Sequence, residues 1–229
     1  MADLIESSLD PSREVLVVPP WVDTEKIKPL ESSLNPYLDK FVNKNDFVVL
    51  YSGNMGHSHD IDSVLRAAEI LQGKKNIKFI FIGEGDKKND IETFVQKKNL
   101  NNISLFHFQP EDMLPFTLTL ADISIVSLDE GMESLMIPSK LFSYLSAGSA
   151  IISISNENSE LSDIINSGSC GLIVKPGNPD ILANSIFSLY NDRDKLEILK
   201  LNSRELAVSK YTRKVVTEEF YRHLNEAGL

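Results

Sequence analysis

The sequence lacks the features that mark secreted, membrane-spanning and nucleic-acid-binding proteins. Its one cysteine, Cys170, has no second cysteine with which to form an internal disulfide, which fits a reducing compartment. No run approaches the roughly 18 apolar residues of a membrane span, and the N-terminus MADLIESSLD has no basic or apolar signal-peptide region. Acidic residues outnumber basic ones by 33 to 23, which argues against a nucleic-acid partner. These absences predict a cytoplasmic protein without a direct membrane span.

What the sequence does contain is one pattern, repeated along the chain. A short β-branched apolar run is followed by a turn and then by a helical stretch. The runs are apolar nearly throughout, which is typical of strands covered on both faces; they lie at 15–18, 47–53, 77–83, 103–109, 122–128, 150–155 and 170–174. Helices are expected at 60–71, 87–99, 139–147, 159–167 and 179–191. This alternation predicts an α/β fold with a doubly wound, Rossmann-like parallel sheet.

The 229 residues are enough for one large domain, and no repeat or flexible linker divides them. We expect a connecting segment with one strand at 1–45, in which Trp21 anchors the chain by packing. A Rossmann-like domain follows at 46–192. A helical extension at 193–229, interrupted near Lys210 and packed on the same domain, completes the chain.

Ligands of open parallel sheets bind outside the carboxyl ends of the strands. The loops expected there lie at 52–59, 83–86, 107–113, 127–140 and 155–160. Gly53 and Gly56, in the first loop, allow backbone N–H groups to approach a phosphate, although a plain tight turn explains them equally well. Because loops at carboxyl ends share one edge of a sheet, we expect 52–59 and 133–140 to meet there.

The start of the helix expected at 139–147 places a cation at this edge. Pro138 suits a first helical turn and Ser139 is a candidate N-terminal cap. Lys140 would then lie close to unpaired N–H donors, a favourable place for a diphosphate. The alternative interpretation is a solvated helix lysine.

Other polar residues favour structural interpretations. Asp60 and Asp62 have the spacing found in metal-dependent sugar transferases, but capping of the helix that they open explains both. No His or Cys cluster has zinc spacing, and we expect no metal. His57 and His59 fit either phosphate contact or a wet loop, and His107, inside an expected strand, is interpreted as structural.

A series of segments in register resembles the C-terminal half of a GT-B glycosyltransferase of the large family 4, over nearly the whole chain. They are VVPPWVDTEKIKP (like the family's IPNGVD), VVLYSGNMGHSHDIDSVLRAA, IKFIFIGEGDKK, LFHFQPEDMLPFTLTLADISIVSL, PSKLFSYLSAGSAII and CGLIVKPGNPDILANSI. The combination of YSGNMG with PSK is similar to the subgroup that makes bacterial surface polysaccharides or related glycans.

The resemblance implies a two-domain enzyme of which this chain is one half. In the family, an N-terminal Rossmann-like domain binds the acceptor, and the C-terminal one binds the nucleotide-sugar donor. The expected activity is metal-independent, retaining transfer of a hexosyl group from a UDP- or GDP-linked sugar, without another cofactor, to a glycan or lipid-linked acceptor. The other half would be a further domain or a partner subunit, and the whole enzyme would be cytoplasmic or peripheral at the inner face of the cell membrane.

The resemblance also implies roles for individual residues. Backbone at the first glycines would approach the diphosphate, the second loop would border the nucleoside, the third would form a wall against the base, and 133–140 would wrap the pyrophosphate and sugar. The expected donor-binding residues are Gly53, Asn54, Gly56, His59, Gly83, Glu84, Gly85, Phe108, Gln109, Met113, Leu114, Glu133, Ser139, Lys140 and Ser143. Glu133 and Lys140 are the candidate catalytic residues.

This sequence departs from the family at its charged positions. Asn54 and His59 stand where many members have an Arg and a Lys that neutralise the diphosphate, and Ser143 stands where the ribose-binding Glu is expected. Our hypothesis is that Lys140, with a contribution from His59, supplies the missing positive charge. The alternative is a non-catalytic, glycosyltransferase-like scaffold or partner module. A nicotinamide oxidoreductase is disfavoured because no GxGxxG follows any expected strand.

Overall fold

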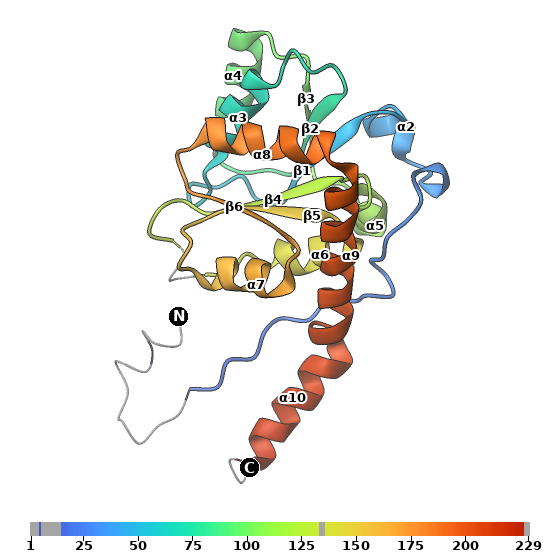
Figure 1. Ribbon diagram of the computed structural model, residues 1–229, viewed down its shortest axis with the longest axis vertical. Helices are drawn as coiled ribbons and strands as arrows, with labels where there is room; N and C mark the ends of the chain where they lie inside the picture. Colours follow the sequence, from blue (N-terminus) through green and yellow to red (C-terminus); the bar gives the residue numbers. More distant parts are fainter. Residues whose placement is uncertain (1–4, 6–14, 133–135, 227–229) are drawn as a thin grey trace.

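The computed structural model describes Ile5, residues 15–132 and residues 136–226 of the chain. At its centre, six parallel strands form one sheet in the order β3-β2-β1-β4-β5-β6 (Figure 1). Their bounds are β1 Phe47–Ser52, β2 Ile77–Ile82, β3 Ile103–Phe106, β4 Ile123–Ser127, β5 Ala150–Ile154 and β6 Gly171–Val174. The predicted α/β class and doubly wound parallel sheet are confirmed.

Helices cover both faces of the sheet, which is why the strands are apolar on both sides (Figure 1). One layer consists of α3 (Ile61–Ile70), α4 (Lys88–Lys98) and α8 (Pro179–Asn191). The opposite layer consists of α5 (Leu114–Leu118), α6 (Lys140–Ala147) and α7 (Glu160–Gly168). Along β1, Val49 and Tyr51 pack into the first layer's core, whereas Val48 and Leu50 pack into the second. The five helices expected in this region are thus present, and each end lies within one residue of the predicted bound.

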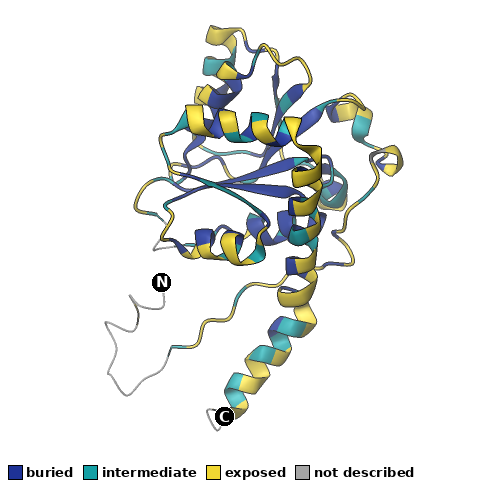
Figure 2. Ribbon diagram, viewed as in Figure 1, coloured by how far each residue is buried: buried dark blue, intermediate teal, exposed yellow. Residues whose placement is uncertain are grey.

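The C-terminal helices α9 (Arg193–Lys210) and α10 (Arg213–Glu226) meet at the interruption expected near Lys210. α9 begins at the amino ends of the strands, where Arg193 lies 4.7 Å from the ring of Phe47, and it then packs against β5 and α6. Val216 is buried in α10, whereas the other residues of this helix are exposed or half-exposed (Figure 2). The domain boundaries inferred from the sequence stay predictions.

The segment before β1 differs from the prediction. No strand forms at 15–18, and Leu16 and Val17 are 43% and 55% exposed. β-branched composition predicted the strand, but the described part of the chain places no neighbour beside this run with which it could form a ladder. A single bridge, Val22 with Thr212, and the short elements η1 (Ser32–Leu34) and α2 (Leu38–Phe41) occupy the segment instead.

The strand order defines where a ligand can enter. The chain runs outward from β1 through β2 to β3, and then returns to the other side of β1 with β4, so the order reverses between β1 and β4. Open α/β sheets bind ligands in the crevice that such a reversal leaves at the carboxyl ends. No helix in the described ranges is both long and apolar enough to cross a membrane.

Candidate functional site

The side chain of Tyr144 hydrogen-bonds α6 to the last residue of β1, next to the point where the strand order reverses. Its buried hydroxyl accepts a hydrogen bond from the amide of Ser52 at 2.8 Å and donates one to the carbonyl of Ser52 at 2.7 Å. Burial raises the pKa of this phenol, so the hydroxyl keeps its proton. The paired bonds set the first turn of α6 against the residue that follows β1, Gly53.

Lys140, in the first turn of α6, reaches into this junction. A Cβ atom on Gly53 would lie 3.5 Å from Lys140 Nζ, and Nζ lies 3.9 Å from the centroid of the Tyr51 ring. Nζ is buried and has no hydrogen-bond partner among the described residues. Because burial removes water from the ammonium, it lowers the pKa of Lys140 to about 7. The structure therefore brings Lys140 to the 52–59 loop, as expected, and leaves its ammonium without a hydrogen-bond partner among the described residues.

A groove of about 350 Å³ opens next to Lys140. It is lined by residues of the β1 and β2 ends, the loop after β3, α5, α6 and the N-terminal segment: Pro20, Trp21, Val22, Ser52, Gly53, Ile82, Phe108, Gln109, Leu114, Thr117, Leu118, Ser139, Lys140, Phe142, Ser143 and Tyr144. Seven of the predicted donor-binding residues line it, namely Gly53, Phe108, Gln109, Leu114, Ser139, Lys140 and Ser143. Its size falls within the range of small-molecule sites.

The glycines after β2 serve loop packing. A Cβ on Gly83 would lie 1.9 Å from the carbonyl oxygen of Gly53, and one on Gly85 would lie 2.6 Å from that of Met55. The amide of Gly53 donates to the Ile82 carbonyl, and that of Met55 to the Glu84 carbonyl. Backbone hydrogen bonding between the two chain segments thus continues past the ends of β1 and β2. Because the amides of Gly53 and Met55 already donate to these carbonyls, they cannot donate to a phosphate.

Four more predicted residues lie outside the groove lining. Asn54 and Gly56 lie close together within the 52–59 loop. The side-chain amide nitrogen of Asn54 would lie 3.1 Å from a Cβ atom added to Gly56. Met113, at the end of η2 (Glu111–Met113), directly precedes α5 and is buried in the core on that side of the sheet. Glu84 hydrogen-bonds Lys88 and His107, and these bonds, chiefly that from Lys88, lower the pKa of its carboxyl.

The histidines differ from their sequence interpretation. His107 follows β3 rather than lying within it, and its side chain is 83% exposed. His59 is buried, and its Nδ1 lies 2.6 Å from the Ser127 carbonyl. Burial, reinforced by the nearby Lys140 charge, lowers the pKa of His59, so the imidazole is neutral near pH 7. The expectation that His59 adds positive charge is at odds with this environment.

The two carboxylates of the expected metal spacing are engaged in helix α3. Asp60 caps α3 by accepting from the Ser63 amide, as predicted, and also accepts from Gly177. Asp62 does not cap; it pairs with Arg66 at 2.7 Å. Among the described residues, no group of three His, Cys, Asp or Glu side chains could hold a metal ion.

Two further expectations concern residues that precede α6 in the sequence. Ser139 directly precedes the helix but forms no side-chain cap, because its φ and ψ of −59° and −24° are already helical rather than extended. Glu133, a candidate catalytic residue, lies outside the described residues.

Sequence reasoning missed three residues at this site. Tyr51 and Tyr144 were given no predicted role, although the four-residue spacing of Lys140 and Tyr144 places both on one face of α6. Trp21 was expected to be packed, but it is 49% exposed and lines the groove, and Val22 is the buried residue instead. Trp21 occupies the place of a Gly in the family pattern IPNGVD, and this replacement was the available signal.

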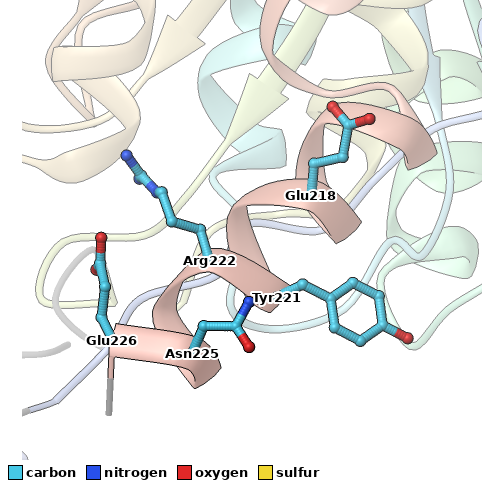
Figure 3. A pocket seen from close by; sticks show the side chains of 5 residues that line it. All are labelled: Glu218, Tyr221, Arg222, Asn225 and Glu226. Carbon is cyan, nitrogen blue, oxygen red and sulfur yellow. The ribbon is translucent and has the colours of Figure 1, made fainter. Parts of the chain in front are cut away.

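A second hollow lies on α10, away from the strand ends (Figure 3). It is lined by Glu218, Tyr221, Arg222, Asn225 and Glu226, all from a single helix. Side chains from one exposed helix surface do not enclose a ligand, so we place the candidate site at the groove beside Lys140.

The fold and the groove together define a Rossmann-like domain with a groove at the carboxyl ends of its strands. Residues 39–206 match the model of the family described as "Glycosyl transferases group 1", and the chain belongs to this family. The membership predicted from the sequence is confirmed.

Two curated relatives are bacterial proteins. The chain is 25% identical over 186 residues to WbjE of Pseudomonas aeruginosa, whose name describes a glycosyltransferase, covering 81% of this chain and 46% of WbjE. It is 28% identical over 157 residues to WcaI of Escherichia coli K12, named for glycosyl transfer in colanic acid biosynthesis, covering 67% of this chain and 38% of WcaI. The chain thus spans less than half the length of these relatives.

Solved structures show the same fold. Sucrose-phosphate synthase of Thermosynechococcus elongatus superposes with a TM-score of 0.80 at 18% identity, over 99% of this chain and 57% of that one. The C-terminal domain of the group 1 protein LpcC of Francisella tularensis gives 0.68 at 19% identity, over 84% of this chain and 99% of the domain. HepE of Anabaena in complex with UDP-glucose gives 0.77 at 15%, over 92% of this chain and 57% of HepE. The chain has the fold of the C-terminal half of a GT-B glycosyltransferase.

Proposed function

We propose that this chain is the donor-binding half of a glycosyltransferase and holds a nucleoside diphosphate sugar in the groove beside Lys140. One observation carries the proposal: the ammonium of Lys140 is buried at the carboxyl edge of the sheet without a hydrogen-bond partner among the described residues. A buried cation is costly unless an anion or other acceptor compensates it. A diphosphate entering the groove supplies that compensation.

The surroundings of Lys140 support a diphosphate over other anions. The N-terminal end of α6 faces the same edge, and the positive end of a helix dipole favours phosphate groups. The amides of Leu141 and Phe142 already donate to the carbonyls of Pro138 and Ser139, so the dipole rather than these two amides acts on the phosphate. The groove continues past Phe108, Gln109 and Ser143, so there is room for a nucleoside next to the phosphates. HepE, which shares the fold, was solved with UDP-glucose.

The proposed reaction places Lys140 at the leaving group. Breaking the bond between the anomeric carbon and the phosphate oxygen develops negative charge on the departing nucleoside diphosphate. The Lys140 ammonium and the positive end of the α6 dipole stabilise that charge, which makes a metal unnecessary. We propose retention of the anomeric configuration on the family resemblance, with a glycan or lipid-linked acceptor held by the other half of the protein.

Titration calorimetry of the 229-residue chain with UDP-glucose and a GDP-linked sugar tests this function. We expect one of the two donors to bind and Lys140→Met to weaken its binding about 10- to 100-fold, since a hydrogen bond to a charged group contributes about 1.5–3 kcal/mol. The matched control is Lys195→Met, which removes the same charge near the start of α9. Equal loss in both variants, or binding unchanged in Lys140→Met, would exclude the proposed role.

The alternative, a non-catalytic glycosyltransferase-like module, is favoured by one observation. Asn54 and the buried, neutral His59 replace two cations that the family resemblance leads us to expect at the diphosphate. The same titration separates the two functions, because such a module binds neither UDP- nor GDP-linked sugars.

A further inference from the structure

Trp21 is the one tryptophan of the chain, and it stands half exposed at the groove. A packing anchor would be buried, whereas 49% of this side chain is open to solvent. The neighbouring residue Val22 is 6% exposed and fulfils the anchoring role in its place. The exposed surface of Trp21 is therefore available to a ligand.

One contact of Trp21 and two of the adjacent Val22 hold the ring in position. The amide of Val22 donates to the Tyr211 carbonyl at 2.8 Å, and Val22 forms a parallel bridge with Thr212. The guanidinium of Arg213 lies 5.4 Å from the centroid of the indole ring. The junction of α9 and α10 thus fixes the backbone next to Trp21, and Arg213 lies against the indole ring. A preorganised aromatic ring loses little conformational freedom when it binds a ligand.

The composition of the groove indicates which part of a nucleotide sugar lies near Trp21. Apolar side chains of β2, α5 and α6 contribute much of the lining, and Phe108 is a second aromatic side chain, 56% exposed. A hexose carries a hydroxyl on most of its carbons and would leave many of them unpaired against such a surface. A planar nucleobase instead gains from aromatic contact and has few edge atoms to satisfy, for which Gln109 and Ser143 are at hand.

We propose that Trp21 stacks on the nucleobase of the donor and that Arg213 supports the ring from the α10 side. This inference rests on the proposed function, and it adds a binding residue from the N-terminal segment to those at the strand ends. The bound base would touch three separate parts of the chain: the N-terminal segment, the loop after β3, and α6.

Because Trp21 is the sole tryptophan, its fluorescence reports on this end of the groove without emission from any other tryptophan. We expect UDP or GDP, whichever binds in calorimetry, to quench the tryptophan emission with the same dissociation constant. Trp21→Ala should weaken nucleotide binding about tenfold and Trp21→Phe by less, since stacking on an aromatic side chain tolerates exchange of the ring. Inorganic pyrophosphate, which has no base, should bind Trp21→Ala as well as it binds the unaltered chain.

Tyr221→Ala is the matched control, because it removes another exposed aromatic side chain, 64% exposed on α10 and outside the groove. It should leave the nucleotide affinity unchanged. If nucleotide binds but neither quenches Trp21 nor weakens in Trp21→Ala, the stacking role is overturned while the proposed function stands. If pyrophosphate and nucleotide weaken equally in Trp21→Ala, Trp21 acts on the fold of the site and the inference is also wrong. If no nucleotide binds the unaltered chain, the proposed function itself fails.

Discussion

At the scale of single residues, the burial of Lys140 is an unfavourable interaction within the candidate site. Its ammonium has exchanged water for the face of the Tyr51 ring, a contact that compensates only part of the lost hydration. The pKa of about 7 in the folded chain, against 10.5 for an ordinary lysine, expresses that cost. A diphosphate would reverse it, so the residue that weakens the empty fold is the one that strengthens binding.

This cost predicts a pH dependence of stability. Between pH 7 and 10.5 the unfolded chain holds the Lys140 proton and the folded chain does not, so the free energy of unfolding rises with pH through this group. Lys140→Met removes the buried charge and should be more stable than the unaltered chain at pH 7. The difference should shrink by about 2 kcal/mol between pH 7 and pH 9.

Urea denaturation of both proteins at the two pH values measures this change. Taking the difference between variants cancels the contributions of the other buried titratable groups, such as Cys170, whose pKa burial raises to about 11. A stability difference that stays constant from pH 7 to pH 9 would contradict the lowered pKa of Lys140.

The sequence located Lys140 but not its environment. Pro138 was expected in the first helical turn, whereas α6 begins at Lys140, two residues later. A helix start close to a carboxyl strand end was nevertheless recognisable, so the place of Lys140 in the fold was predictable. Its burial depends on the Tyr51 ring and on Gly53, which are distant in sequence, and local patterns carry no information on such contacts. His59 misled for the same reason, because its partner is the carbonyl of Ser127 on β4.

At the scale of elements, the relation between β1 and α6 sets the geometry of the site. Tyr144 bonds both the amide and the carbonyl of Ser52, so one hydroxyl fixes the helix that carries Lys140 to the strand that leads to Gly53. Tyr144→Phe keeps the ring but leaves two backbone groups of Ser52 without this partner. Leaving buried polar groups unpaired costs about 1–3 kcal/mol each.

We therefore expect Tyr144→Phe to lower the free energy of unfolding by about 2 kcal/mol and to weaken donor binding, although Tyr144 contributes no charge. Tyr190→Phe is a suitable comparison, since the Tyr190 ring packs against Phe47 in the other layer, at the amino end of β1. Chemical denaturation and calorimetry together test the role. Donor affinity preserved in a destabilised Tyr144→Phe would show that the bonds to Ser52 do not position Lys140.

Strands and helices of the central domain followed from the sequence, whereas the first segment did not. Strands that helices cover on both faces are apolar at nearly every position. Such apolar runs can be recognised as strands when helical stretches separate them along the sequence. The run at 15–18 has the same composition but remains exposed, because composition does not reveal whether a neighbouring strand exists. Gly83 and Gly85 were expected to border the nucleoside, but the close approach of the neighbouring 52–59 loop is what requires glycine at both positions.

At the scale of the whole molecule, the chain has one half of the fold of a two-domain enzyme and spans less than half the length of its curated relatives. The proposed site binds the donor from one side. An acceptor, and any group that activates it, would have to come from the other half, and catalysis requires both reactants in one geometry.

The 229-residue chain should therefore bind a nucleotide sugar but transfer its sugar negligibly when alone. Incubation with UDP-glucose and the GDP-linked sugar, followed by detection of released UDP or GDP, measures this. Addition of a polypeptide that supplies the N-terminal half should raise the release. Rapid transfer by the isolated chain would show that its own residues complete the active site.

The central claim is that the buried ammonium of Lys140 binds the diphosphate of the donor. NMR of lysine side chains labelled at Cε tests it most directly. A Lys140→Arg variant identifies the Lys140 signal, and titration with pH gives its pKa in the free chain and with saturating nucleotide sugar. The account predicts a pKa near 7 in the free chain and a rise when the donor binds. An ordinary pKa near 10.5 in the free chain, or a value that the donor leaves unchanged, would contradict it.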